Sequence, residues 1–346
     1  MKVAAYSPTI RRKEMNAVLS VMVEDKIGPG EQSKLLVQTA KEKLKFETCL
    51  ALRSPAIALF QALKSLGLEK GDGVLISALS PLYYNCVIED LGLKTVYSDV
   101  LPSTASMSFE TIEKALQQKP DGLSVKCIVK HHTLGYLGVD TKINELGIPV
   151  IEDSSRSYGT VFPNDDTAND NAKVFSILGL EERDLLTSGG GALLYSSNRR
   201  SSRSVNLPDN MPQEYGLPDM NAALAVIQFK EAEKHLSKRR EIAELYTQSA
   251  LRSRHMRFIQ QGADYNNYAF PLILKSGLKD VKTYARKKEI EVESAFENTP
   301  AGNGLISPEA CPEAYSLSLR TVLFPLYPTL KMADAGRVAK IIQTLP

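Results

Sequence analysis

The sequence predicts an α/β protein with a mostly parallel β-sheet, covered by helices on both faces and followed by a smaller C-terminal domain. Short apolar segments rich in β-branched residues alternate with segments of helical periodicity in the first half of the chain. This alternation is typical of parallel strands joined by crossover helices. The 346 residues also exceed what one small core needs and suit a large domain plus a small one.

Six segments have the composition of buried strands, and helical patterns separate several of them. The strands are predicted at residues 74–76, 95–97, 127–129, 149–151, 174–177 and 192–194. The helices between them are predicted at residues 56–66 and 109–116. Polar stretches that begin at residue 163 and that cover residues 198–215 are predicted to be surface loops.

A long helix is predicted after the second loop. Met220, Leu224 and Ile227 fall at helical spacing, and Pro218 stands near the start, where its missing N–H does no harm. The helix is expected to lead into a C-terminal domain of roughly a hundred residues, a usual domain size. The predicted division is residues 1–235 and 236–346, with a C-terminal strand at residues 268–274.

The composition argues against several classes of protein. Lys plus Arg number 42 and Asp plus Glu number 40, so the net charge of +2 offers no broad field for nucleic acid or an anionic membrane. No apolar run approaches the ~20 residues of a membrane helix, and the N-terminus lacks the apolar segment of a signal peptide. We expect a cytoplasmic protein without a metal site, because the four cysteines are far apart: Cys49, Cys86, Cys127 and Cys311.

Six short motifs occur in an order that resembles one known family. They are IGPG at residues 27–30, GDGVLI at 71–76, VIED at 150–153, NAAL at 221–224, KRREIA at 238–243 and LFPLYP at 323–328. Each motif is weak alone. Their order and spacing over almost the whole chain resemble the DegT/DnrJ/EryC1/StrS aminotransferase family.

The resemblance implies the fold of the pyridoxal-phosphate-dependent transferases of fold type I, which is aspartate aminotransferase-like. Its large domain has a mainly parallel seven-stranded sheet, and its small C-terminal domain is α+β. The resemblance also implies a homodimer with two shared active sites. Active members bind pyridoxal phosphate (PLP) and move an amino group from glutamate or glutamine to a keto-sugar nucleotide.

The lysine that holds this cofactor in the family is missing here. The family's strand motif and its later glycine motif bracket residues 178–188, which contain neither lysine nor histidine. The lysine column falls on Glu181, Glu182 or Arg183. A guanidinium stays protonated and does not form an imine, so Arg183 is no substitute. Covalent binding of PLP is therefore not expected.

Other cofactor columns of the family also fall on altered residues. The phosphate-binding Ser-Gly-Thr becomes Ser54, Pro55 and Ala56, which lose one N–H and one hydroxyl but make a good plain helix start. The resemblance places Pro81 at the column of the stacking ring. Ser176 keeps the family's phosphate-binding serine.

Asp153 matches the carboxylate that keeps the pyridine nitrogen of the cofactor protonated. Arg156 stands where the family has glutamine, and it is expected either to neutralise Asp153 in an emptied pocket or to be exposed. Glu214 falls on a phosphate-binding column, where a carboxylate repels phosphate. The candidates for the ligand cleft are Glu214, Tyr83, Tyr84 and His132. The alternative is core packing for the two tyrosines and a structural role for His132.

Three functions remain open at this stage. The first is a degenerate member that keeps a cleft for a sugar nucleotide or other small ligand. The second is an active aminotransferase of nucleotide-sugar metabolism with a relocated lysine, either Lys173 or Lys130. The third is new acid–base chemistry in the same cleft, drawing on His132, Asp153, Arg156, Tyr83 and Tyr84.

Overall fold

The structure is a computed structural model that describes most of the chain. The described residues are 2–136, 140–161, 172–197, 211–259, 264–275 and 277–346. The loop predicted from residue 163 and most of the loop predicted at 198–215 lie outside these ranges. Only the end of the second is described, where a 3₁₀ turn, η4, spans Gln213–Tyr215.

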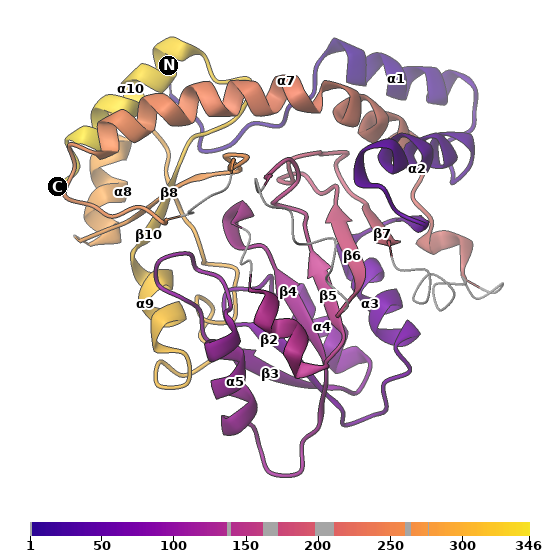
Figure 1. Ribbon diagram of the computed structural model, residues 1–346. Coiled ribbons are helices and arrows are strands. Elements are labelled where there is room, and N and C mark those ends of the chain that lie inside the picture. The colour runs from indigo at the N-terminus through magenta and orange to yellow at the C-terminus, as the bar shows by residue number, and fades with distance from the viewer. Residues whose placement is uncertain (1, 137–139, 162–171, 198–210, 260–263, 276) are drawn as a thin grey trace.

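A seven-stranded sheet forms the centre of the large domain (Figure 1). Its strands, in spatial order, are β1 (Thr48–Leu52), β7 (Ala192–Ser196), β6 (Lys173–Gly179), β5 (Val150–Asp153), β4 (Val125–His131), β2 (Gly73–Ser77) and β3 (Lys94–Ser98). The strands from β6 to β3 are parallel, whereas β7 is antiparallel to both of its neighbours. The predicted α/β class and all six predicted strands are confirmed, and β1 is an addition.

Helices cover both faces of this sheet because the buried strands are apolar on both sides. One face packs against α3 (Pro55–Ser65) and α4 (Tyr83–Asp90). The other packs against α5 (Phe109–Gln118), α2 (Glu31–Leu44) and the first half of α7 (Asp219–Ala250). Two short 3₁₀ helices follow β4: η1 (Thr133–Gly135) and η2 (Thr141–Leu146).

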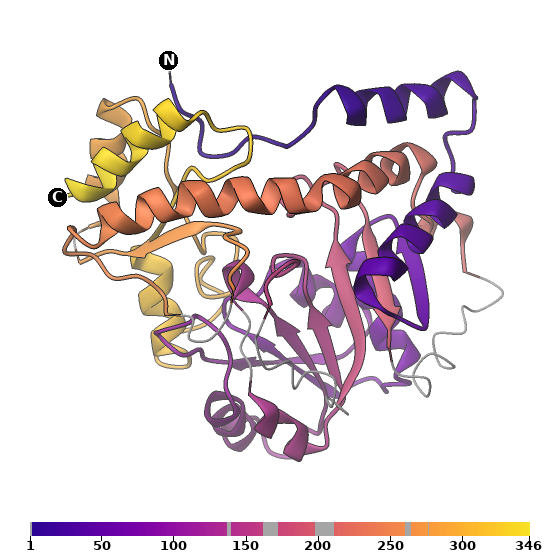
Figure 2. The same ribbon diagram turned by 45° about the horizontal axis from the view of Figure 1, so that its top comes forward.

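The C-terminal region forms a second layer of structure around its own apolar core. An antiparallel sheet of β8 (Phe270–Ile273), β10 (Thr321–Phe324) and β9 (Glu293–Ser294) packs with α8 (Leu278–Lys287), α9 (Pro312–Arg320) and α10 (Met332–Gln343). The 32-residue helix α7 passes along both regions (Figure 2). The predicted division at residue 235 falls inside this helix, and it stays a prediction.

Arg239 fixes the second half of α7 to the C-terminal region. Its Nη1 donates hydrogen bonds to the backbone carbonyls of Asn267 at 3.3 Å, Tyr268 at 2.8 Å and Leu326 at 2.9 Å. About two turns further along, the Tyr246 hydroxyl donates to the carbonyl of Pro325 at 2.8 Å. Buried carbonyls need such donors, so these two side chains set where the C-terminal strands sit against the helix.

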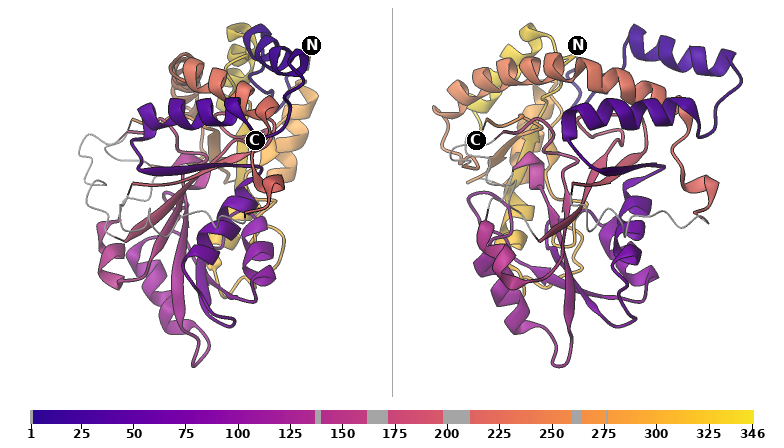
Figure 3. Two further views of the ribbon diagram at one scale, coloured as in Figure 1. Left: turned by 90° about the vertical axis from the view of Figure 1, so that its right-hand side faces the viewer. Right: turned by 45° about the vertical axis from the view of Figure 1, so that its right-hand side comes forward.

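The N-terminal helix α1 (Arg12–Val23) lies at the periphery and contacts the rest of the molecule through α7 (Figure 3). Glu14 and Val21 are its buried residues. Gln228 of α7 donates to the carboxylate of Glu14 at 3.2 Å and to the carbonyl of Thr9 at 2.9 Å. Within the described ranges, no helix combines the length and apolar character that crossing a bilayer requires.

Replacing the buried Arg239 with methionine is expected to lower the free energy of unfolding by about 3 kcal/mol, because three backbone carbonyls lose a charged donor. The neighbouring Arg240 is the matched control: its ion pair with Asp264, at 3.7 Å, is largely exposed. Arg240→Met is expected to cost at most ~1 kcal/mol. Urea unfolding followed by circular dichroism measures both values, and equal losses would contradict the assignment.

Candidate functional site

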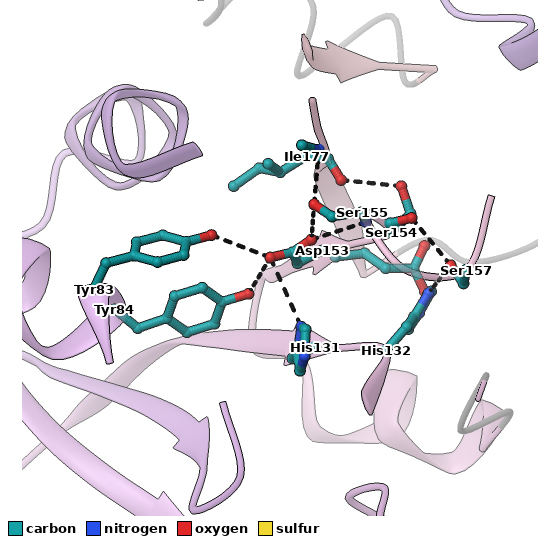
Figure 4. A network of polar contacts seen from close by, with 11 residues as sticks. Tyr83, Tyr84, His131, His132, Asp153, Ser154, Ser155, Ser157 and Ile177 are labelled. Carbon is teal, nitrogen blue, oxygen red and sulfur yellow. Dashed lines mark hydrogen bonds and ion pairs between the residues drawn. The ribbon is translucent and has the colours of Figure 1, made fainter. Parts of the chain in front are cut away.

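Asp153 is the last residue of the central strand β5, and only 1% of its surface is exposed to solvent. Its Oδ1 accepts hydrogen bonds from the Ser155 N–H at 3.0 Å and the Ser155 hydroxyl at 2.5 Å. Its Oδ2 accepts from the hydroxyls of Tyr84 at 2.5 Å and Tyr83 at 3.2 Å (Figure 4). An ionised carboxylate has about four lone-pair directions, so these donors saturate it.

The electrostatics agree with this geometry. Burial opposes ionisation of Asp153, but His131, Ser155 and Tyr84 favour it, and the pKa of Asp153 lies well below its ordinary value. Burial, and then the nearby charge of Asp153, raise the pKa of both Tyr83 and Tyr84 well above 10.0. The tyrosines therefore keep their protons and act as donors to the carboxylate.

His131 flanks the same carboxylate without bonding to it. Its Nδ1 is 3.8 Å from Asp153 Oδ2, which is outside hydrogen-bond range. Among the described residues, neither ring nitrogen has a hydrogen-bond partner. Burial lowers the pKa of His131, so the ring is neutral near neutral pH. The hydroxyl and amide donors therefore make the hydrogen bonds to Asp153, and His131 adds a favourable contribution to its ionisation from 3.8 Å.

His132 belongs to a different cluster, on the opposite face of the sheet. Glu152 precedes Asp153 in β5, so its side chain points the other way. Its Oε1 lies 3.0 Å from His132 Nε2, and its Oε2 accepts from the Lys173 amine at 3.1 Å. His132 Nδ1 is 2.5 Å from the Ser157 hydroxyl. Burial opposes ionisation of Glu152, but His132 and the two nearby lysines hold the pKa of Glu152 well below its usual range.

Both lysines that could replace the missing one engage this Glu152 cluster. Lys130 pairs in register with Glu152 in the sheet, and its amine lies 3.8 Å from Glu152 Oε1. Lys173 binds the other carboxylate oxygen. Ser176 is also in register with Glu152 and therefore lies on the face opposite Asp153. The structure thus separates Ser176, Lys130 and Lys173 from the Asp153 carboxylate.

The interval without lysine forms a turn after β6. The Asp184 carboxylate accepts from the Glu181 N–H at 2.9 Å, while Glu182 and Arg183 are exposed. The Arg183 guanidinium reaches the C-terminal sheet and makes two hydrogen bonds with Glu293, at 2.6 Å and 3.1 Å. This interval therefore connects the two regions of the protein.

The N-terminus of α3 offers few free donors. Pro55 has no N–H, the Ile57 N–H donates to the Ser54 hydroxyl at 3.2 Å, and the Ala58 N–H donates to the Ser54 carbonyl at 3.1 Å. Ala56 is left with the one free N–H of the first turn. Glu214 lies nearby and exposed, because the Arg53 N–H holds the neighbouring turn η4.

A cavity of about 750 Å³ lies between the large domain and the C-terminal sheet. The large domain contributes Pro81, Tyr83 and Arg156, so three predicted site residues do come together. The C-terminal side contributes residues that no sequence motif indicated: Tyr268, Lys282, Glu293, Glu297 and Asn298. Their contribution depends on how the two regions pack, which a sequence pattern does not reveal.

Asp184 is the other residue that the sequence interpretation missed. Its carboxyl approaches Ser155 closely, since a Cβ added to Gly179 would lie 2.4 Å from Asp184 Oδ2 and 2.8 Å from Ser155 Oγ. Burial raises the pKa of Asp184 from 3.8 to about 7. A single acidic residue in a polar turn carries no sequence signal for such an environment.

Comparison with known proteins gives one family and one fold. The model of the DegT/DnrJ/EryC1/StrS aminotransferase family matches residues 8–343. The aminotransferase TlmJ from Streptoalloteichus hindustanus is similar with a TM-score of 0.87 and 18% identity, over 99% of this chain and 98% of that one. Spr1654 from Streptococcus pneumoniae in its PLP form is similar with a TM-score of 0.86 and 16% identity, over 99% and 98% of the chains.

A mutant of GDP-4-keto-6-deoxymannose-3-dehydratase with bound GDP-perosamine is also similar, with a TM-score of 0.81 and 16% identity over 98% of this chain and 100% of that one. At such identities the likeness shows the fold alone. The fold is therefore that of the PLP-dependent aminotransferases, as predicted: a mostly parallel seven-stranded sheet with helices, and an additional small sheet.

The residues around Asp153 do not fit PLP as they are arranged. A pyridine nitrogen needs a free carboxylate lone pair, but Ser155, Tyr83 and Tyr84 occupy those of Asp153. A phosphate group needs several converging donors at a helix N-terminus, and the first turn of α3 retains one free amide. The phosphate end has therefore lost donors, whereas the carboxylate at the pyridine end is retained but already engaged.

Replacing Tyr84 with phenylalanine is expected to lower the free energy of unfolding by about 2 kcal/mol, because a buried carboxylate loses a short charge-assisted hydrogen bond. Tyr83→Phe is the matched control and is expected to cost less, since its bond is longer at 3.2 Å. Urea unfolding at neutral pH measures both. A larger loss for Tyr83→Phe would contradict this account of Asp153.

Replacing Asp184 with asparagine is expected to flatten the pH dependence of stability. The pKa of Asp184 is raised to about 7 in the folded protein, against about 3.9 when unfolded. Between these values the folded state keeps a proton that the unfolded state loses, so the stability of the native protein falls as pH rises from about 4 to 7. Above pH 7 the free energy of unfolding of Asp184→Asn is expected to exceed that of the wild type by up to about 4 kcal/mol. Unfolding curves at several pH values test this, and parallel profiles for the two proteins would exclude it.

Proposed function

We propose that this chain, which belongs to the DegT/DnrJ/EryC1/StrS aminotransferase family, is a degenerate member that binds a small ligand but forms no Schiff base with PLP. The observation that carries the proposal is the saturated carboxylate of Asp153. Two tyrosine hydroxyls occupy the oxygen that would otherwise face a pyridine nitrogen. The absence of lysine from residues 178–188 supports the same conclusion.

The retained binding site is the cavity between the two regions of the protein. Its volume of about 750 Å³ lies within the range of small-molecule sites, and it carries aromatic, cationic and acidic side chains. One structural neighbour has a bound nucleotide sugar, GDP-perosamine. We therefore propose a sugar nucleotide or another small hydroxylated molecule as the class of ligand.

An active PLP-dependent aminotransferase that acts on a keto-sugar nucleotide, in polysaccharide or amino-sugar biosynthesis, is the alternative. One observation favours it: Lys282 lines the cavity and supplies a primary amine there. Its amine donates a hydrogen bond to the Ser294 hydroxyl at 2.9 Å. Lys130 and Lys173 support this alternative less, because both bind Glu152 on the other face of the sheet.

A homodimer is part of the same proposal. Met15, Leu19, Met22 and Val23 occupy one face of α1 at helical spacing, and each is more than half exposed. Ile27, just beyond the helix, is equally exposed. An apolar stripe of this kind on the outside of a helix is typical of an interface between proteins. We infer that the apolar stripes of two copies of this chain are buried in the interface of the dimer.

We also infer a reducing compartment, the cytoplasm. The four cysteines are free thiols, and two of them, Cys127 and Cys311, are buried. Burial raises the pKa of Cys311 to about 12, which keeps its thiol protonated and unreactive. Proteins that work in oxidising compartments more often pair their cysteines.

The proposal predicts that the purified protein forms no specific imine with PLP. Incubation with the coenzyme, reduction with borohydride and peptide mapping are expected to give only scattered labelling of surface lysines. An Asp153→Asn variant is the control, since an imine held in the site would weaken when the carboxylate is lost. A stoichiometric adduct on Lys282, Lys173 or Lys130, or transfer of nitrogen from glutamate to a keto-sugar nucleotide, would establish the alternative.

The homodimer is expected to dissociate when charge is placed on the apolar stripe. Leu19→Glu should shift the protein from dimer to monomer in analytical ultracentrifugation, because a carboxylate would be buried in an apolar interface. Leu251→Glu is the control, because Leu251 is also exposed but lies at the far end of α7. A wild-type protein that sediments as a monomer, or a Leu19→Glu dimer of unchanged affinity, would contradict the inference.

A further inference from the structure

The cavity contains three cationic side chains, of which two are already engaged. Arg183 makes two hydrogen bonds with the carboxylate of Glu293, at 2.6 Å and 3.1 Å. Lys282 donates to the Ser294 hydroxyl at 2.9 Å. The remaining cation is Arg156, which lines the wall formed by the large domain.

Arg156 lacks the carboxylate partner that a largely buried guanidinium normally has. Its guanidinium carbon lies 5.4 Å from the centre of the Tyr268 ring, and among the described residues no acidic side chain is within ion-pair distance of it. Asp153 is near but is saturated by other donors. Asp184 is also near, and its raised pKa of about 7 leaves it partly protonated at neutral pH. Together with Tyr268 these carboxyl groups raise the pKa of Arg156 despite its burial, so the guanidinium stays charged. It lines the cavity without an ion pair among the described residues, so an incoming anion would find a charged hydrogen-bond donor there.

The backbone around Arg156 is held in place before any ligand arrives. The side-chain amide of Asn266, which is fully buried, donates to the carbonyl of Arg156 at 2.8 Å and accepts from the Tyr268 N–H at 2.9 Å. Gly135 permits this approach, because a Cβ there would lie 2.6 Å from the Arg156 carbonyl oxygen. Asn266 therefore fixes the backbone of both Arg156 and Tyr268, and preorganisation of this kind lowers the cost of binding.

We propose that Arg156 is the anchor of an oxyanion subsite in this cavity and binds a carboxylate or phosphate group of a small hydroxylated molecule. The planar guanidinium presents parallel N–H donors that match either oxyanion. Glu297 and Asn298, on the opposite wall, are exposed to the cavity and supply acceptors for hydroxyl groups. This inference rests on the proposed role of the cavity as a ligand site and adds the charge of the ligand.

Calorimetric titration with three related probes tests the subsite, with no coenzyme present. Glucose is neutral, glucuronate carries a carboxylate, and glucose 1-phosphate carries a phosphate. The wild-type protein is expected to bind at least one of the two anions about tenfold or more tightly than glucose. The anion that binds more tightly identifies the carboxylate or the phosphate as the preferred group.

Arg156→Gln is expected to weaken binding of that anion by about tenfold or more, since it removes the charge and keeps polarity. Arg257→Gln is the matched control: it removes an arginine that also lies over an aromatic ring, that of Phe270 at 5.5 Å, but outside the cavity. It should leave the affinity unchanged. Arg156→Lys keeps the charge without the planar pair of donors, so it should lose affinity several-fold even if the glutamine variant folds poorly.

Three results would overturn the subsite: no anion bound more tightly than glucose by the wild type, unchanged affinity in Arg156→Gln or Arg156→Lys, or an equal loss in Arg257→Gln. Because the titration contains no PLP, its outcome is separate from the borohydride test. A specific imine would refute the proposed function and leave the oxyanion result standing. Absence of oxyanion binding would leave the conclusion on the imine intact.

Discussion

A buried carboxylate must be given hydrogen-bond donors or a counter-ion, and the centre of this protein is organised around meeting that requirement at Asp153. The sheet places Asp153 at the end of β5, deep between neighbouring strands. The chain supplies hydroxyls from α4 and an amide and hydroxyl from Ser155. Within the described residues no lysine or arginine forms an ion pair with Asp153, so hydroxyl and amide donors, together with the nearby His131, stabilise its negative charge. The same donors remove the free acceptor that a pyridine ring would use.

The two faces of the sheet therefore have different chemistry. On the face of Asp153, neutral donors surround one charge and an open cavity follows. On the opposite face, Glu152 is neutralised by two lysines and bonded to His132. Adjacent residues of one strand thus belong to a hydrogen-bonded carboxylate site and to an ion cluster. The alternation of side chains along a strand is what keeps the two apart.

Much of the fold was predictable from the sequence because local patterns encode it. The strands of the parallel sheet are continuous apolar segments, and α7 shows its helical spacing over many residues. The sequence also indicated Asp153, Arg156 and Pro81 as candidate site residues, because their positions follow from strand ends and motif columns. The hydrogen bonds of Tyr83 and Tyr84 to Asp153, about seventy residues away in the sequence, were not predicted. The sequence does not show which way the side chains of a helix turn.

The rest of the site depended on packing between distant segments. Tyr268 and Lys282 line the cavity, and Arg239 helps to hold the C-terminal strands against α7 by hydrogen bonds to the carbonyls of Tyr268 and Leu326. Burial raises the pKa of Asp184, and this burial is not evident from the sequence because the neighbouring residues are polar. Ser176 is an instructive case: its motif is retained, but its register with Glu152 places it on the other face from Asp153.

The continuity of α7 has a mechanical consequence. The helix contains neither proline nor glycine over its 32 residues, so it has no intrinsic point of bending. Both regions that form the cavity pack against α7. A hinge-like closure of the C-terminal region would therefore have to bend or break this helix. The size of the cavity is therefore fixed before a ligand binds, and ligands should be selected by whether they fit it.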